Sequence, residues 1–169
     1  FERKKLLVAA VSAALLFDYL AIPYPVYEMK VPGIYYRLAE RQEKFAVLEV
    51  PVTDYPTVLQ FYQTIHHHPI PMGAITHIPP WRFDFLGGYP VVRELVETSL
   101  ITPARTGELR GRGRQLLLDK NIRYVILHPG LIKPAPAAAR VRAFLDAVLG
   151  LPPVWQDDEV VVWQLEETG

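Results

Sequence analysis

The hydrophobic pattern in the centre of the chain predicts alternating strands and helices. Residues Phe45 to Val50 form an apolar run rich in β-branched and aromatic side chains, which predicts a strand that ends at Pro51. The next segment, Tyr55 to Ile65, has apolar residues at helical spacing. A loop with three consecutive histidines, two prolines and a glycine follows. Strand, turn, helix and polar loop in this order are typical of an α/β unit, whose loops often carry sites.

The C-terminal part of the chain continues this alternation. Ile122 to Leu127 is nearly all apolar, which predicts a strand covered on both faces. Pro134 to Leu149 is amphipathic and predicts a helix that Gly150 caps. The end of the chain predicts a hairpin, in which Val154 to Gln156 pairs with Val160 to Leu165.

Three shorter amphipathic segments predict further helices at residues 33–43, 89–101 and 114–120. Asn121 is a good stop for the last of them, and residues 102–113 are expected to be a polar loop. The sequence therefore predicts an α/β fold, with a small mixed sheet flanked by helices and a C-terminal hairpin.

The N-terminal segment is apolar and has basic residues on one side only. Arg3 to Lys5 precede an apolar run from Leu6 to Phe17 that only one serine interrupts. Counted through Ile22 the run reaches seventeen residues, close to the roughly 20 that a membrane-spanning helix needs. The basic cluster and the pair Asp18-Tyr19 match the positive-inside rule and the aromatic belt. We expect a transmembrane helix here; a core element and a secretory signal peptide are the alternatives.

These segments divide the chain into three regions. Residues 1–22 are the expected membrane anchor, residues 23–44 a proline-rich linker with the first helix, and residues 45–169 the α/β domain. Because the chain begins with Phe1 rather than methionine, we expect a fragment or a processed product. The formal net charge is zero, which argues against a nucleic-acid partner. The absence of cysteine excludes disulfides, cysteine nucleophiles and thiolate metal sites.

The order of these pieces resembles a known family, the extracytoplasmic C-terminal region of polytopic membrane glycosyltransferases of the C-type superfamily and their uncharacterised relatives. Four pieces carry the resemblance. They are Asp18-Tyr19-Leu20 followed by Pro23 and Pro25; Val31-Pro32 through Tyr36-Arg37-Leu38-Ala39, leading into Val47-Leu48-Glu49-Val50-Pro51; Tyr62-Gln63-Thr64 with His66, Pro69, Ile70 and Gly73; and Ile122-Arg123-Tyr124-Val125-Ile126-Leu127-His128.

The resemblance implies a non-catalytic accessory domain. In such enzymes, which take sugars from polyprenyl-phosphate donors, the catalytic acid lies in a membrane region that this sequence lacks, so no catalytic residue is carried over. The implied partners are membrane lipid, the missing transmembrane region or neighbouring membrane subunits, and a polyprenyl-phosphate sugar. No cofactor is implied. The alternatives are a structural subunit of a membrane complex that contacts neighbouring chains, and a soluble α/β enzyme with a histidine site.

The histidine loop and the aromatic segment after it provide candidate ligand-facing residues. They are Tyr62, His66, His68, His77, Arg82 and Asp84. Three of the histidines could bind zinc, but no carboxylate stands at a familiar ligand spacing and two prolines restrict the loop, so we expect no metal site. A loop that faces a sugar or a phosphate is the functional alternative to helix capping and exposed imidazoles.

A second candidate site is a group of arginines. Arg105, Arg110, Arg112 and Arg114 fall within ten residues, and arginine forks suit phosphates, so an anion or lipid headgroup contact is the functional interpretation and a solvated loop the alternative. For catalysis, neither serine has the glycine context of a nucleophile elbow. Glu49, Asp54 and His128 could pair in space, which the sequence alone does not decide.

Overall fold

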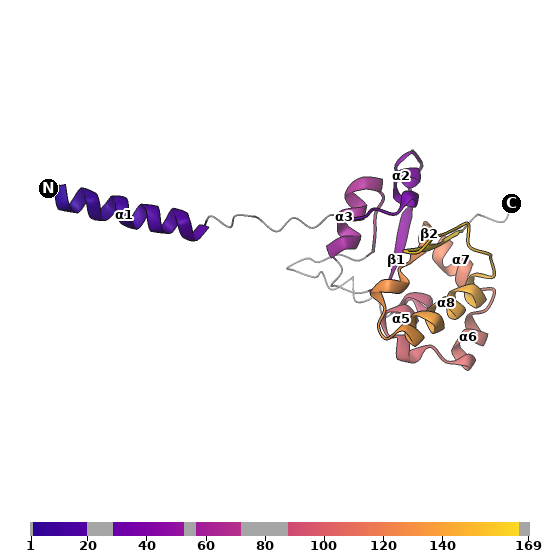
Figure 1. Ribbon diagram of the computed structural model, residues 1–169. Coiled ribbons are helices and arrows are strands. Elements are labelled where there is room, and N and C mark those ends of the chain that lie inside the picture. Colours follow the sequence, from indigo (N-terminus) through magenta and orange to yellow (C-terminus); the bar gives the residue numbers. More distant parts are fainter. Residues whose placement is uncertain (1, 20–28, 53–56, 72–87, 166–169) are drawn as a thin grey trace. The chain divides into compact units, whose positions relative to one another are not determined.

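The computed structural model describes residues 2–19, 29–52, 57–71 and 88–165, and the chain divides into two compact units, residues 1–30 and 31–169 (Figure 1). The first helix of the predicted linker region falls inside the second unit rather than before it.

Within its described residues, the first unit contains one helix, α1, from Glu2 to Tyr19. The expected helix is present, and Leu20 to Ile22, which we had included in it, lie outside the described residues. None of the side chains of α1 is buried, and its apolar residues are spread around the whole circumference of the helix rather than along one stripe. Among the described helices, none is both long enough and apolar enough to cross a membrane.

The second unit is built on a mixed sheet, which confirms the expected α/β class. The described strands follow the order β1-β2-β4-β3. Strand β1 (Ala46–Val50) pairs in parallel with β2 (Ile122–Leu127), and β4 (Val161–Gln164) pairs with β2 in the antiparallel direction. The short strand β3 (Trp155–Gln156) completes the predicted hairpin with β4.

Helices cover both faces of this sheet. Figure 1 shows α2 and α3 on one side of β1 and β2, and α5 to α8 on the other. The helices are α2 (Gly33–Ala39), α3 (Thr57–His66), α5 (Pro90–Val96), α6 (Pro103–Leu109), α7 (Gly113–Leu118) and α8 (Ala135–Leu149), with two 3-10 turns at Thr98–Leu100 and Pro129–Leu131.

Alternation along the strands divides the core into two clusters. Successive side chains of a strand point to opposite faces of the sheet. Val47 and Ile126 therefore pack with α2 and α3, whereas Leu48 and Val125 pack with α5, α7 and α8. The expected coverage of the Ile122–Leu127 strand on both faces is thus confirmed. Glu49 lies two residues after Val47, so it faces α2 and α3 as well.

One predicted loop is a helix. Residues 102–113 were expected to be a polar loop, but Pro103–Leu109 forms α6. The Thr102 side chain caps it by accepting a hydrogen bond from the Arg105 backbone N–H at 3.3 Å, and Pro103 occupies its first turn, where a missing N–H costs nothing. Thr102 and Pro103 were given less weight in the sequence analysis because glycines and arginines dominate this segment and favour a loop. The helix expected over residues 89–101 also ends earlier, at Val96, and continues as a 3-10 turn.

Two predicted helix stops adopt the left-handed backbone that ends helices. Asn121 has φ of 57°, and Gly150 has φ of 64°. Glycine meets this conformation without strain, and asparagine is the next most tolerant residue. The Asn121 side chain also donates a hydrogen bond to the Lys44 carbonyl oxygen at 2.8 Å, which ties the end of α7 to the segment before β1.

The contact between α7 and α8 depends on a residue without a side chain. A Cβ atom on Gly113 would lie 1.9 Å from Cγ1 of Val148 and 3.2 Å from the Val148 carbonyl oxygen. We expect Gly113→Ala to lower the free energy of unfolding by about 1–3 kcal/mol, because the added methyl group overfills this contact. Urea denaturation measures the change.

Gly107 in α6 provides the matched control. A Cβ atom there meets nothing within 4 Å, so Gly107→Ala should raise the free energy of unfolding by roughly 0.5–1 kcal/mol through helix propensity alone. If the two variants were equally stable, α7 and α8 would not be packed as closely as the structure has them.

Candidate functional site

A carboxylate and an imidazole meet at the carboxyl edge of the two parallel strands. Glu49 is the fourth residue of β1, and His128 directly follows β2. The His128 backbone N–H donates to the Val50 carbonyl oxygen at 2.8 Å, so the ladder between the strands continues to this point. Ligands of open α/β sheets bind at this edge, which makes the pair the first place to look for chemistry.

A tyrosine from α2 closes the pair into a triangle. His128 Nε2 lies 2.8 Å from Glu49 Oε2, and the Tyr35 hydroxyl lies 3.1 Å from each carboxylate oxygen of Glu49. The same hydroxyl lies 2.9 Å from His128 Nε2. Each of the three groups therefore lies within hydrogen-bond distance of the other two.

The triangle is sealed from solvent. The exposed fractions are 0% for Tyr35, 2% for Glu49 and 4% for His128. Burial raises the pKa of the Tyr35 hydroxyl far above its ordinary value, and the nearby charge of Glu49 and the hydrogen bond to it raise this pKa further. The hydroxyl therefore stays protonated and acts as a hydrogen-bond donor to Glu49.

Aromatic rings from α2, α3 and the histidine loop extend the site as a stack. The Tyr35 ring stacks with Tyr62, with ring centroids 4.4 Å apart, and with His66, at 5.6 Å. His68 continues the stack at 5.7 Å from His66 and 3.8 Å from Phe45. The stacked rings hold α3 and the histidine loop against α2, next to the Glu49–His128 pair.

His66 is a buried, neutral member of this stack. Its Nδ1 accepts a hydrogen bond from the His68 backbone N–H at 3.1 Å, and its Nε2 has no partner among the residues that the structure describes. Burial, followed by the nearby imidazoles of His68 and His67, lowers the pKa of His66 to about 4. At neutral pH the ring is therefore uncharged.

The other two histidines of the loop have different surroundings. His68 Nε2 lies 2.9 Å from the Leu38 carbonyl oxygen and donates to it, which satisfies a carbonyl group near the end of α2. His67 is exposed and has a positive φ of 60°. His67 is thus exposed where its two neighbours are buried, and the loop begins directly after the end of α3 at His66.

The candidate ligand-facing residues thus separate into two groups. Tyr62, His66 and His68 lie in the core, and their burial favours a structural role. His77, Arg82 and Asp84 lie outside the described residues, as does Asp54. Within the described part of the chain, no three histidine, aspartate or glutamate side chains are grouped as metal ligands.

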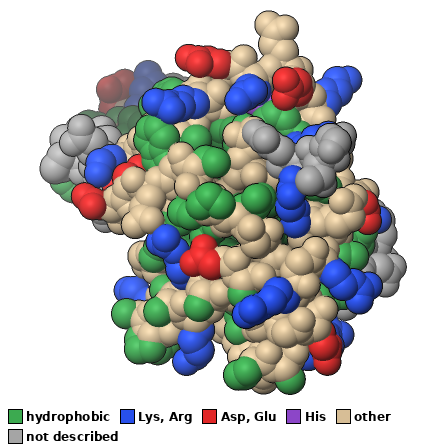
Figure 2. Space-filling view, turned by 90° about the vertical axis from the view of Figure 1, so that its right-hand side faces the viewer, with side chains coloured by type: hydrophobic (Ala, Val, Ile, Leu, Met, Phe, Trp, Pro, Cys, Tyr) green, Lys and Arg blue, Asp and Glu red, His purple; other side chains and the backbone are tan. Residues whose placement is uncertain are grey.

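The arginine group is spread over three settings. Arg105 binds the buried Glu94 at 3.0 Å and also pairs with Glu108, so it serves the packing of α5 against α6. Arg114 is half-buried, and Arg110 and Arg112 are exposed. On the face shown in Figure 2, basic side chains alternate with acidic and hydrophobic ones rather than forming one continuous patch. Arg105 is thus held in ion pairs, and an anion contact at the other three arginines stays a prediction.

Tyr35 is the site residue that the sequence analysis missed. It lies on the buried face of α2, and its hydroxyl is the group that bonds Glu49. The signal that could have found it is Glu49 itself, a single acidic residue at an inward position of an apolar strand. Such a residue requires a donor from whatever packs on that face.

The Tyr35 hydroxyl can be tested by removing one oxygen atom. Tyr35→Phe leaves the buried Glu49 carboxylate with a donor missing, so we expect the free energy of unfolding to fall by about 1–3 kcal/mol. Tyr36→Phe is the control, since Tyr36 is 56% exposed and its variant should stay within about 0.5 kcal/mol of the wild type. Equal stability of both variants in urea denaturation would contradict the closed triangle.

The lowered pKa of His66 predicts that the protein loses stability in mild acid. Its folded pKa of about 4 lies below the ordinary value near 6.5, so protons bind the unfolded chain more readily. The stabilisation is therefore complete above about pH 6.5 and is lost as the pH falls toward 4. By pH 5 the loss should reach about 2 kcal/mol relative to neutral pH.

Replacing the imidazole should remove this pH dependence. In His66→Phe, which keeps a stacking ring, the free energy of unfolding should fall less between pH 7.5 and pH 5 than it does in the wild type. His67→Asn is the control, because His67 is exposed and asparagine tolerates its positive φ. An unchanged pH dependence in the His66 variant would show that another group causes the acid sensitivity.

The chain matches no protein-family model, no curated protein and no solved structure. Its function has to be inferred from its own residues and their geometry.

Proposed function

We propose that this chain is a non-catalytic accessory domain of a membrane glycosyltransferase-like protein, located on the extracytoplasmic side. The observation that carries the non-catalytic part is the closed triangle of Tyr35, Glu49 and His128. It contains the groups that acid–base catalysis uses, but each is bonded to the others and buried. A general acid or base must come within hydrogen-bond reach of its substrate, and the side chains of His128 and Glu49 are only 5% and 2% exposed.

The α1 helix supports the membrane part of the proposal. A helix that is apolar on every side normally lies in a protein core or in lipid. Every described side chain of α1 is exposed, including Leu7 and Phe17, so its apolar surface requires an environment other than water. We propose that this environment is membrane lipid or the neighbouring helices of a longer membrane protein. Arg3 to Lys5, at the start of α1, would then lie at the membrane surface next to lipid headgroups.

The glycosyltransferase part rests on the sequence resemblance and on the agreement of its pieces with the fold. The resembling segment Val47 to Pro51 includes most of β1, and the segment Ile122 to His128 is β2 with the histidine of the triangle. The two segments pair with each other, and both contribute a side chain to the triangle. In the proposed assembly this domain stands beside the sugar-transfer chamber and supports it without taking part in the chemistry.

A transfer assay on the full-length membrane protein that carries this chain tests the proposal. Its readout is sugar transfer from a polyprenyl-phosphate donor in detergent or vesicles. Glu49→Gln and His128→Gln keep the shape of the buried groups, so the turnover should stay within about twofold of the wild type as long as the domain is folded. Loss of a true general acid or base would lower it by roughly 10²–10⁴-fold.

Two outcomes would contradict the proposal in different ways. A folded Glu49→Gln protein without transfer activity would make the triangle catalytic. A full-length wild-type protein that transfers no sugar from any polyprenyl-phosphate donor would remove the glycosyltransferase assignment and favour a structural subunit of a membrane complex. The melting temperature of each variant distinguishes loss of chemistry from loss of folding.

A further inference from the structure

The amino edge of the parallel strands, opposite the triangle, is hollowed. One cavity of about 340 Å³ is lined by residues that precede β1, begin β2 and end β4, and a second of about 220 Å³ lies between these strands, the end of α2 and the segment at β3. Both are lined by Tyr124 and Gln164, so the two cavities adjoin. Their joint volume is in the range of small-molecule sites.

One side of this groove carries guanidinium groups. Arg37 and Arg41 stand four residues apart at the end of α2, and both line the smaller cavity. The Arg37 guanidinium carbon lies 4.5 Å from the centre of the Trp155 ring, which holds this side chain in place. Neither arginine forms an ion pair with any described carboxylate. Arg123 adds a third guanidinium to the lining of the larger cavity.

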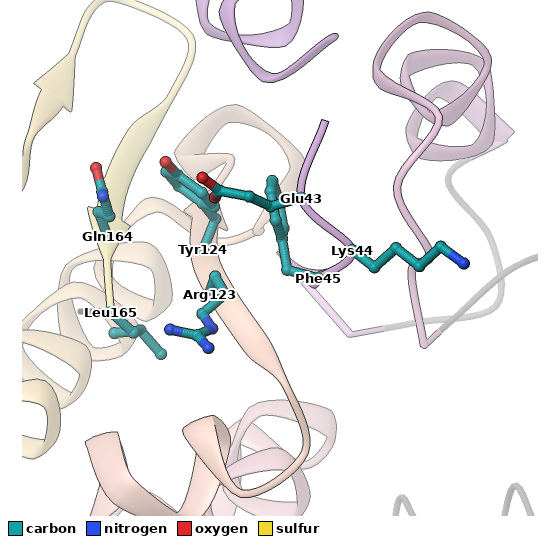
Figure 3. A pocket seen from close by; sticks show the side chains of 7 residues that line it. All are labelled: Glu43, Lys44, Phe45, Arg123, Tyr124, Gln164 and Leu165. Carbon is teal, nitrogen blue, oxygen red and sulfur yellow. The ribbon is translucent and has the colours of Figure 1, made fainter. Parts of the chain in front are cut away.

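The larger cavity also carries an acceptor. Figure 3 shows the Glu43 carboxylate directed toward Tyr124 and Gln164, while the Lys44 side chain extends away from the other labelled side chains. Glu43 has no ion-pair partner among the described residues. The groove therefore pairs cationic donors with a carboxylate rather than presenting positive charge alone.

The floor beneath these groups is rigid and apolar. Leu38, Phe45 and Leu165 are buried core residues that also line the cavities, and Tyr124 is almost fully buried. The backbone that carries the polar side chains is therefore fixed by the core, and the Arg37 side chain is also held by its contact with Trp155.

We propose that the groove binds the phosphate ester of a polyol, with Arg37 and Arg41 on the phosphate and with Glu43 and Gln164 on the hydroxyl groups. Arginine forks match the geometry of phosphate oxygens. Glu43 repels a bare anion but accepts hydrogen bonds from hydroxyls next to the phosphate, so it selects for a polyol over inorganic phosphate. The ligand chemistry is shared by a soluble glycerol phosphate and by a glycerophospholipid headgroup. The inference does not depend on the proposed role of the domain beside a glycosyltransferase.

Calorimetric titration of the full chain with glycerol 3-phosphate tests the soluble source. Arg41→Gln should weaken binding about tenfold, which is the loss of about one charge-assisted hydrogen bond. Glu43→Gln should reduce the preference for glycerol 3-phosphate over inorganic phosphate several-fold. Lys44→Gln is the matched control: it removes the same charge as Arg41→Gln from a neighbouring position whose side chain is directed away, so it should bind as the wild type does.

Co-sedimentation with vesicles tests the lipid source. Binding to phosphatidylcholine vesicles measures the association that α1 provides. Any additional binding to phosphatidylglycerol vesicles measures recognition of the glycerol phosphate headgroup. A phosphatidylglycerol advantage that Arg41→Gln removes and Lys44→Gln retains would assign the groove to the lipid headgroup, whereas binding of free glycerol 3-phosphate alone would assign it to a soluble ester.

The proposal is overturned if neither form binds. It is also overturned if Arg41→Gln and Lys44→Gln reduce binding equally, because the effect would then be general electrostatic attraction rather than a site. Association with phosphatidylcholine vesicles is read separately in the same experiment, so failure of the groove and failure of the membrane attachment remain distinguishable.

Discussion

Burial of the Glu49 carboxylate is the constraint on which the arrangement of α2, β1 and β2 depends. A carboxylate removed from water costs several kcal/mol unless donors replace the lost solvent. Its partners here are Tyr35, fourteen residues earlier, and His128, seventy-nine residues later. Neither partner is local, so the carboxylate is satisfied only when the helix and both parallel strands have assembled. The chain cannot bury one of these elements without the other two.

The chain buries two carboxylates, Glu49 and Glu94, and each is satisfied by different partners. On the face toward α2 and α3 the buried carboxylate is bonded to a neutral hydroxyl and an imidazole, and stacked rings fill the space around them. On the other face the core cluster against the sheet is apolar. The buried Glu94 of α5 is instead neutralised by the partly exposed guanidinium groups of Arg93 and Arg105. Removing one partner of either buried carboxylate leaves a desolvated group behind, so both constrain the fold more strongly than their net contribution to stability suggests.

Local patterns were enough to predict the elements whose signals agree with each other. The Ile122–Leu127 strand, the α8 helix with its Gly150 cap and the terminal hairpin were all predicted from periodicity and turn residues, because burial and propensity favour the same structure there. Helix α6 was missed, since Gly107 and the arginines outweighed its short capping signal at Thr102 and Pro103. The triangle was out of reach for a different reason. Glu49 and His128 were suspected as partners, but their contact depends on the parallel register of β1 and β2, which no local pattern contains.

Polar side chains lie at both edges of the parallel strands, but those at the carboxyl edge are buried and those at the amino edge are mostly exposed. The carboxyl edge of parallel strands usually holds the ligand, because side chains there can point outward into loops. In this chain that edge turns its acid and base inward, where Tyr35 satisfies them, so they hold the structure together. At the amino edge the antiparallel β4 ends beside the start of β2. Two cavities there share Tyr124 and Gln164, and Arg37 and Arg41 line the smaller one. Glu49 and His128 thus stabilise the packing of α2 on the sheet, whereas Arg37 and Arg41 at the other edge are exposed to solvent.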